Sequence, residues 1–447
     1  MLKSINKLYL LASILLYFIL SPKVSGEYLL ITLFAIFSFI SYFTILYINS
    51  SINVKFHTKT YLGIEVFIYS ILFVAIQNLI SYHYTNNFFM FSDSDAFTYH
   101  LKTIDILHMS FENAIKHYLN SMSFDDLGII LILYPLYHIS ESNLILNFFY
   151  LFVAVITALS IFRLSENFMT KKYAFLSSLS YSLSSFVLFF HSTGLKESFM
   201  VMLVVLSFDL YYKFLRTKNI LNLIGALLFM GSLLLFRPAI AGMIIGSIGF
   251  GSLISKKGGI SIKIISFFIF IFLIFMSDSI IAIIKVYTTG GFETLIYARE
   301  SQGMIKGGIT FTYAVNILAQ AIGPLPTIIS PSDKILLAFY APGLIYRILL
   351  AFPFWFGIIY IYKTKSYKLY PLIIFVIMEM LALIYLMDGF ELRKAIPHIS
   401  IVFVIAFWFL DNYDRGIIRF QKRKRFNQFF KFSIFILIWL IFYWNFR

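Results

Sequence analysis

Residues 143–162 read NLILNFFYLFVAVITALSIF, a mostly apolar run that carries no charge, and Arg163 follows it directly. A helix of about 20 apolar residues crosses the ~30 Å hydrocarbon core of a bilayer. Similar runs recur along the 447 residues, and the chain is 60% hydrophobic and only 13% charged, with a mean hydropathy of +0.86. This balance excludes an ordinary soluble domain. We therefore predict an all-α, polytopic integral membrane protein.

Hydropathy predicts about 13 spans in a single transmembrane domain that takes in residues 1–447. The spans are expected near 8–21, 28–48, 61–81, 143–162, 173–191, 198–212, 219–236, 238–255, 264–284, 345–362, 369–387, 398–411 and 432–446. The first of these has no convincing small-residue cleavage site after it, so we interpret it as a retained helix. The run 127–139 is shorter than a span and is interpreted as re-entrant or interfacial.

The formal net charge of +15 comes mostly from short loops between the expected spans. If the spans alternate, the basic loops all fall on one side: Lys55/Lys59, Arg163/Lys171/Lys172, Lys213/Arg216/Lys218, Lys256/Lys257/Lys263, Lys363/Lys365/Lys368 and Arg415/Arg419/Lys422/Arg423/Lys424/Arg425. Short loops rich in Lys and Arg mark the cytoplasm. The charge is therefore read as an orientation signal and not as a nucleic-acid surface. The chain has no cysteine, which excludes a disulfide framework and a thiolate metal site.

Two large segments, 82–142 and 285–344, then lie outside the membrane. The first has an apolar stripe at helical spacing, which predicts a helix lying in the membrane interface. The members of this stripe are Phe97, Leu101, Ile104, Leu107, Phe111, Ile115 and Tyr118. The second segment is rich in Gly and Pro, which is typical of an ordered loop that covers a ligand.

Polar residues from distant parts of the chain gather on this outer side. Asp93 and Asp95 open the interfacial helix, and His100 follows them. Two carboxylates at such a helix start suit a general base or a cation site, although acidic residues are also ordinary helix caps. We take Asp93 and Asp95 as candidate catalytic residues and His100 as a candidate substrate-binding residue.

Two further outer turns carry basic residues. Lys196 and Glu197 open a span, where a lysine can hold a phosphate, although snorkelling and helix capping explain the pair as well. Arg237 lies in a tight turn between two apolar runs, directly before Pro238. It needs a counter-charge, which a phosphate, a lipid or the aspartates of the first loop could supply.

Arg299 and Lys306 of the second outer segment, with Arg347 where the chain returns to the membrane, are candidate anion contacts. Solvation is the competing explanation for charges in a loop of this length. Arg347 is therefore considered only as a candidate anion contact.

The turn 388–398 is the densest in charge and holds Arg393, Lys394 and His398. Basic residues are disfavoured on the outer side, so a compensating interaction is expected. An anionic substrate would provide it, and so would local pairing with Asp388 and Glu391. We take Arg393, Lys394 and His398 as candidate substrate-binding residues.

Two carboxylates fall within expected spans. Glu379 is near the middle of one, so it is either functional or held as a protonated or arginine-paired residue. Asp209 is expected to pair with Lys213, one helical turn later.

Taken together, these features resemble the GT-C superfamily of membrane glycosyltransferases. There, an aspartate of the first external loop acts as the base or organises the acceptor, and Asp93 and Asp95 match that position. The sequence Tyr134-Pro135-Leu136-Tyr137 resembles the proline-containing re-entrant region of that superfamily. The turns 195–197, 236–238 and 392–397 resemble external turns that contact lipid phosphate. The likeness covers roughly residues 61–411, and each motif is only a few residues long.

In hydrophobicity, number of spans and position of the large outer loop, the chain is similar to the Wzy-type O-antigen and capsule polymerases. This resemblance implies that Arg237, Arg299 and Arg393 engage undecaprenyl pyrophosphate. It further implies an inverting glycosyltransferase of the bacterial inner membrane whose active site faces the periplasm. The expected partners are a polyprenyl-linked oligosaccharide and membrane lipids. No cofactor is expected, while a divalent cation and a chain-length regulator remain open.

Three alternatives are left open. The first is a transferase that moves a single sugar from a polyprenyl-phosphate donor. The second is a flippase or transporter for a lipid-linked oligosaccharide, which would place polar groups along a transmembrane path. Glu379 favours this second class, although the sequence has no internal repeat. The third is a structural membrane protein without catalytic activity.

Overall fold

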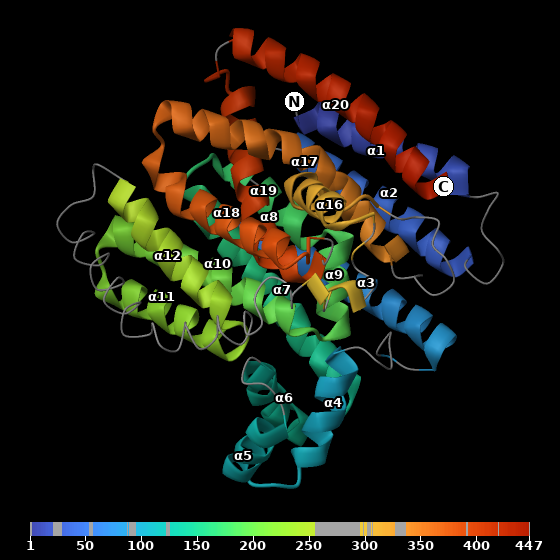
Figure 1. Ribbon diagram of the computed structural model, residues 1–447, viewed down its shortest axis with the longest axis vertical. Helices are drawn as coiled ribbons and strands as arrows, with labels where there is room; N and C mark the ends of the chain where they lie inside the picture. Colours follow the sequence, from blue (N-terminus) through green and yellow to red (C-terminus); the bar gives the residue numbers. More distant parts are fainter. Residues whose placement is uncertain are drawn as a thin grey trace.

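The computed structural model describes residues 2–20, 29–52, 57–86, 88, 95–121, 126–254, 296–297, 299–301, 305, 307–326, 337–389, 392–418 and 420–446. Within these residues every regular element is a helix (Figure 1). The helices are α1 (Leu2–Leu20), α2 (Leu29–Ser51), α3 (Lys59–Thr85), α4 (Asp95–Ile106), α5 (Phe111–Ser121), α6 (Leu127–Ile139), α7 (Asn143–Glu166), α8 (Lys171–Ser182), α9 (Ser185–Thr193), α10 (Lys196–Thr217), α11 (Ile220–Ser232), η4 (Leu233–Leu235), α12 (Pro238–Ile254), α16 (Ile309–Ile322), α17 (Leu337–Thr364), η6 (Tyr367–Leu369), α18 (Tyr370–Tyr385), α19 (Leu392–Asp414) and α20 (Phe420–Phe446). The prediction of an all-helical fold is thus confirmed.

Eight of the described helices are long and apolar enough to cross a membrane, or nine if one bent pair counts as a span. The chain is therefore a multi-pass membrane protein. The expected number of about 13 spans is not confirmed. The helices α6, α11, α12 and α16 are apolar but shorter than a span, and the expected span 264–284 lies outside the described residues.

The stretch 173–191, expected as one continuous span, is broken. Its two helices, α8 and α9, meet at an angle of 53°. At the break the Ser184 hydroxyl donates to the Ser180 carbonyl at 2.7 Å, and the Tyr42 hydroxyl donates to the same carbonyl at 2.5 Å. The Ser184 amide instead bonds to the Tyr181 carbonyl. Serine side chains compete with the backbone for helix hydrogen bonds, so a serine-rich stretch can be apolar enough to span and still bend.

The centre of the bundle is α19, which is buried along almost its whole length and packs against α8, α10, α17 and α18. Phe403 and Phe407 of α19 are completely buried. By contrast, α11 and α20 expose large apolar side chains such as Leu221 and Phe435. Exposed apolar faces of this extent belong against another apolar phase, which for the helices of a membrane protein is the lipid.

The segment expected as one interfacial helix is in fact two helices, α4 and α5, with a turn at residues 107–110. Of the expected apolar stripe, Leu101 and Phe111 are exposed, as side chains that face lipid would be. The buried face of α4 instead carries Tyr99, Thr103 and Ile106. This face packs against α6, an apolar partner within the protein that periodicity alone does not reveal.

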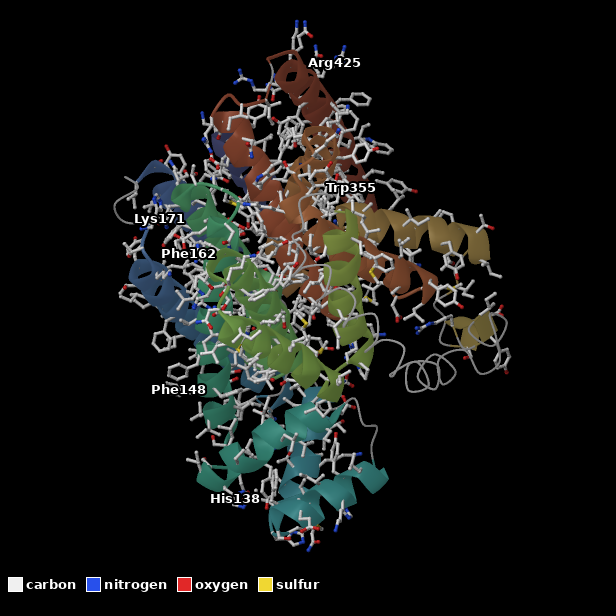
Figure 2. All side chains as sticks on the ribbon, turned by 90° about the vertical axis from the view of Figure 1, so that its left-hand side faces the viewer. His138, Phe148, Phe162, Lys171, Trp355 and Arg425 are labelled. Carbon is white, nitrogen blue, oxygen red and sulfur yellow. The ribbon has the colours of Figure 1, made fainter. Side chains whose placement is uncertain are left out.

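The helices α10, α12 and α18 each run between two opposite ends of the bundle. At 1.5 Å per residue, the 22 residues of α10 extend about 33 Å, which is close to the thickness of the hydrocarbon core. One end carries α4, α5 and α6, and we call it the α4–α6 end. His138 lies at this end, whereas Lys171 and Arg425 lie toward the other, which we call the far end (Figure 2).

Close packing at the far end gives a stability prediction. A Cβ atom added to Gly251 of α12 would lie 2.8 Å from the backbone nitrogen of Pro371. We expect Gly251→Ala to lower the free energy of unfolding by about 1–3 kcal/mol, because α12 and α18 must separate. The measurement is thermal unfolding of the purified protein in detergent.

Gly242, on the same helix, is the matched control. A Cβ atom there would meet nothing within 4 Å. Gly242→Ala should stabilise the protein by about 0.5–1 kcal/mol through helix propensity. If Gly251→Ala and Gly242→Ala changed the stability of the protein equally, the close approach of α12 to Pro371 would be contradicted.

Candidate functional site

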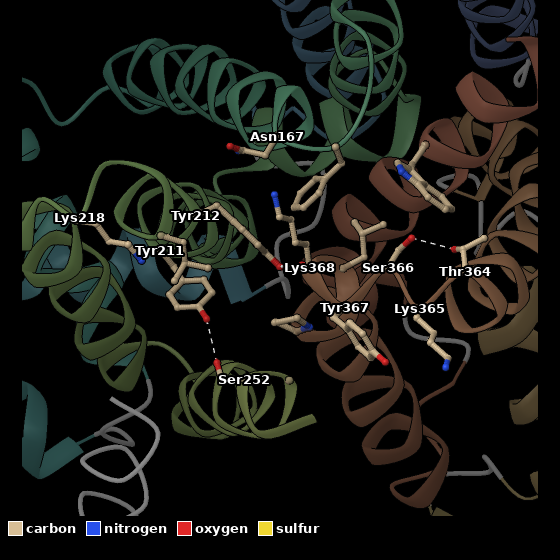
Figure 3. Close-up of a pocket in the computed structure, with 16 residues that line it drawn as sticks. Asn167, Tyr211, Tyr212, Lys218, Ser252, Thr364, Lys365, Ser366, Tyr367 and Lys368 are labelled. Carbon is tan, nitrogen blue, oxygen red and sulfur yellow. Dashed lines mark hydrogen bonds between the residues drawn. The ribbon is translucent and has the colours of Figure 1, made fainter. Parts of the chain in front are cut away.

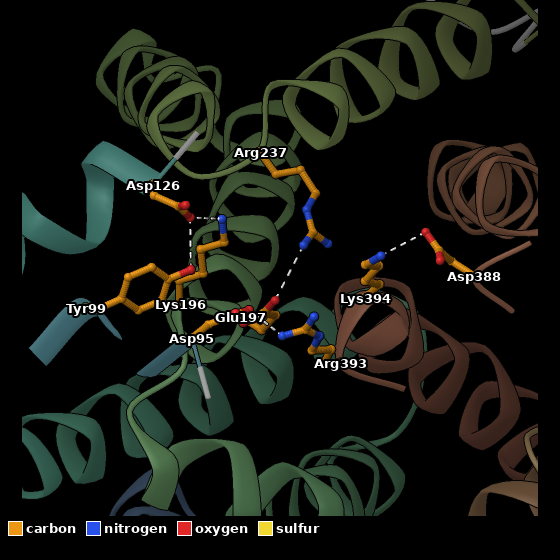
Figure 4. Close-up of polar contacts among 9 residues, drawn as sticks. All are labelled: Asp95, Tyr99, Asp126, Lys196, Glu197, Arg237, Asp388, Arg393 and Lys394. Carbon is orange, nitrogen blue, oxygen red and sulfur yellow. Dashed lines mark hydrogen bonds and ion pairs between the residues drawn. The ribbon is translucent and has the colours of Figure 1, made fainter. Parts of the chain in front are cut away.

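Charged residues from several helix starts meet at the α4–α6 end in a continuous set of ion pairs (Figure 4). We call this set the polar cluster. It consists of Asp95, Tyr99, Asp126, Lys196, Glu197, Arg237, Arg299, Asp388, Arg393 and Lys394. Adjacent residues in the sequence connect one ion pair to the next, because Lys196 is followed by Glu197 and Arg393 by Lys394. The cluster therefore joins residues that are up to about 300 positions apart in the sequence.

The outermost pair is Asp95 with Arg393, the first residue of α4 and the second of α19. The side chain of Asp95 is 51% exposed and that of Arg393 is 35% exposed, so both are accessible to a substrate. An acidic residue in the first turn of α4 is also favoured by the helix dipole. An arginine beside an accessible carboxylate provides an anion contact next to a potential base.

Lys196 pairs with Asp126, which precedes α6. The Tyr99 hydroxyl donates to the same carboxylate at 2.9 Å. Burial first, and the nearby carboxylate of Asp126 second, raise the pKa of Tyr99, so its phenol stays protonated as a donor. Asp95 and Tyr99 lie one turn apart on α4, and this connects the two ion pairs. The sequence reasoning missed Asp126, although the acidic pair Asp125-Asp126 directly before the apolar run 127–139 was an available signal.

Arg237 reaches Glu197 at 3.4 Å, from Nη2 to Oε1. The counter-charge expected for Arg237 is thus a residue of α10 and not an aspartate of the first outer loop. Glu197 is only 3% exposed, and its second oxygen, Oε2, has no hydrogen-bond partner among the described residues. At 3.4 Å this pair is long for a charge-assisted bond, so a phosphate can compete with Glu197 for Arg237.

Asp388 lies between two cations, Arg299 at 2.9 Å and Lys394 at 2.8 Å. The local pairing of Lys394 with Asp388, one of the two alternatives for this turn, is present in the structure. The backbone of Gly389 fixes the turn, since its amide donates to Asn316 at 2.6 Å and its carbonyl accepts from Gln320 at 2.8 Å. One buried carboxylate therefore offsets two cations here. Within the described cluster, five cations face four carboxylates, which leaves an excess of positive charge.

Three ionisable residues lie deeper, within the spans: Arg347, Glu379 and His398. Each is at most 4% exposed. Glu379 and His398 approach to 3.7 Å, and neither side chain has a hydrogen-bond partner in the described part of the chain. Arg347 donates to the Gln320 carbonyl at 3.4 Å, but Nε and Nη1 have no partner among the same residues. His398, expected in the outer turn, thus lies below the polar cluster because α19 begins six residues earlier.

The structure places His100 beside α6. Its Nδ1 lies 2.8 Å from the hydroxyl of Tyr137 on α6. Two other candidates, Asp93 and Lys306, lie outside the described residues. The expected pair of Asp209 with Lys213 is wrong, because Asp209 bonds to Arg163 of α7 at 2.7 Å.

His100 gives a prediction for acid stability. Burial lowers the pKa of His100, and the nearby Glu141 only partly opposes this effect. The folded state then binds fewer protons than the unfolded state. Above the ordinary histidine pKa of about 6.5, the neutral His100 does not oppose folding. As the pH falls below that value toward the lowered pKa, the unfolded state gains a proton that the folded state does not, and the protein loses stability. His100→Gln should reduce the difference in melting temperature between pH 7.5 and pH 5.5.

In the described residues no group of three His, Asp or Glu side chains could hold a metal ion. What the cluster offers is a set of cations, one accessible carboxylate and a protonated phenol at the boundary of an apolar bundle. This combination can bind an anionic group and accept a proton beside it. No family model and no curated protein matches the chain.

Proposed function

We propose that this protein is a membrane glycosyltransferase that uses a sugar donor linked to polyprenyl pyrophosphate. Its reaction is the polymerisation of lipid-linked O-antigen or capsule repeat units. The observation that carries the proposal is the meeting of Arg237, Arg393, Arg299 and Lys394 with an accessible carboxylate, Asp95, at one end of the membrane bundle.

The chemistry of a lipid-linked donor requires such an arrangement. The polyprenyl tail stays in the bilayer, and its charged phosphates stay at the surface beside the helix ends. Arginine binds phosphate in a bidentate manner, and an excess of cations stabilises the charge that develops on the leaving group. The ion pairs of the cluster hold these cations in place until a phosphate competes for them.

In the proposed step, the acceptor hydroxyl gives its proton to Asp95 as its oxygen bonds to the anomeric carbon of the donor sugar. The bond from that carbon to the phosphate oxygen breaks, and the pyrophosphate departs toward Arg237 and Arg393. The configuration at the anomeric carbon is inverted because the displacement is direct. Tyr99 donates its one hydroxyl hydrogen to Asp126 and so helps to hold the ion pair of Asp126 with Lys196 in place.

The proposed orientation follows from charge. The basic residues Arg163, Lys171, Arg216 and Lys365 are at helix ends opposite to the polar cluster. The rule that short basic loops stay in the cytoplasm then assigns the cluster to the periplasmic side of a bacterial inner membrane.

The test is complementation of a strain that lacks this protein, scored by the length distribution of the surface glycan. Loss of a polymerase leaves single repeat units on the surface, and the intact protein restores the ladder. A wild-type ladder in the deletion strain would reject the proposal. Restoration of a single terminal sugar, without any change in chain length, would favour the single-sugar transferase.

A second candidate function, transport of the lipid-linked oligosaccharide, is favoured by Arg347, Glu379 and His398 within the spans. Ionisable groups at that depth often line a substrate or proton path. Under this alternative, the deletion strain accumulates lipid-linked intermediates in the cytoplasmic leaflet, and Glu379→Gln reproduces the accumulation. Under the polymerase proposal, the intermediates reach the surface and stay unpolymerised.

A further inference from the structure

A cavity lies at the far end of the bundle, away from the polar cluster. Its volume is about 760 Å³, within the range of roughly 300–1,000 Å³ of small-ligand sites. It is enclosed by the last turns of α10 and α12 and by the turn that joins α17 to α18 (Figure 3). Because α10 and α12 begin at the polar cluster, the cavity is separated from it by their full lengths.

The wall of the cavity is preformed and includes five aromatic side chains. Tyr211 and Ser252 join α10 to α12 through their hydroxyls at 3.0 Å. The Tyr212 hydroxyl donates to the carbonyl of Lys368 at 2.5 Å and so fixes the turn before α18. Trp408 of α19 lines the inner side. Aromatic residues at helix ends are typical of the level of lipid headgroups.

The charge of the lining has one sign. Lys218, Lys365 and Lys368 are exposed around the cavity, and the described residues that line it include no carboxylate. Figure 3 draws Lys218 and Lys365 on opposite sides, with Lys368 between them. Lys218 and Lys365 also have positive φ angles of 58° and 52°, a conformation that favours glycine or asparagine. A binding role for the two side chains accounts for lysines at positions where the backbone disfavours them.

We propose that this cavity binds an acidic phospholipid. The phosphate lies among the three lysines, and the first part of an acyl chain lies against Trp408 and Leu215. Basic pockets between membrane helices bind anionic headgroups in this way. A soluble phosphate would leave the aromatic wall without a partner, which is why the charge complementarity and the apolar wall together indicate a lipid.

The test uses the purified full chain in a neutral detergent, with binding measured by native mass spectrometry and by the shift of the melting temperature. The probes are phosphatidylglycerol, phosphatidylcholine and glycerol 3-phosphate. The variant is K218N/K365N/K368Q, in which asparagine keeps the left-handed backbone. Each lysine near an anionic headgroup contributes about fivefold to affinity, so the variant should bind phosphatidylglycerol about 100-fold more weakly.

The matched control is K7Q/K59Q/K171Q, which removes the same charge from exposed positions that do not line the cavity. It should bind phosphatidylglycerol as the native protein does. The proposal is overturned if phosphatidylcholine binds equally well, if glycerol 3-phosphate alone gives the same shift, or if the two triple variants lose affinity to the same extent. Because none of these residues belongs to the polar cluster, the outcome does not depend on the proposed transferase activity.

Discussion

Replacing Asp95 with asparagine should lower glycosyl transfer by about 10²–10⁴-fold, the usual contribution of a positioned general base. The amide keeps the size of the side chain and its place in the first turn of α4, but it cannot accept the acceptor's proton. The variant should insert and fold normally, since Asp95 is half exposed. The measurement is the length of the surface glycan in the complemented strain, with the amount of protein in the membrane determined in parallel.

Asp105→Asn is the control, because Asp105 lies on the same helix and is exposed. It should leave the glycan ladder unchanged. A second comparison distinguishes two roles of Asp95, that of a general base and that of an ion-pair partner of Arg393. If Asp95 only neutralises Arg393, the exchanged pair Asp95→Arg with Arg393→Asp will restore the ladder. Restoration in that double variant, or normal chain length in Asp95→Asn, would exclude Asp95 as the base.

The encounter of Asp95 with Arg393 follows from reasoning that the sequence already permits. Apolar runs of the right length must cross the bilayer, so the parity of crossings decides which turns share a side. The starts of α10 and α19 and the turn before α12 were therefore assigned to one side. The structure joins the start of α10 to the turn before α12 and the start of α19 to the start of α4, each through an ion pair. The roles of these residues remain predictions.

The sequence does not predict which residue each charged side chain pairs with. Lys196 could be assigned to the outer side, but its pairing with Asp126 depends on where the packing of α6 against α4 and α7 places the start of α6. Asp209 was matched with Lys213 because they are one turn apart, whereas the close packing of α7 on α10 brings Arg163 nearer. Periodicity describes one helix at a time, so it cannot choose between a local partner and one on a neighbouring helix.

Replacing Arg347 with methionine should have two opposite effects, a gain in stability and a loss of activity. The side chain is 2% exposed within α17, and two of its three guanidinium nitrogens have no partner among the described residues. A buried charge without full pairing opposes folding, and an apolar residue of similar length removes this cost, for a gain of about 1–4 kcal/mol. The same charge can attract an anionic substrate from the polar cluster toward the bundle core, so transfer should fall at least about 100-fold.

Leu350→Met on the same helix is the control for packing, and it should change stability by less than about 1.5 kcal/mol without affecting the glycan ladder. Arg237→Met provides the contrast. It removes the partner of Glu197, which is 3% exposed, and should therefore destabilise the protein by about 3 kcal/mol. Thermal unfolding without substrate measures all three. A destabilised Arg347→Met with a normal ladder would mean that Arg347 is a structural residue, because a charge kept for a ligand must cost stability when the ligand is absent.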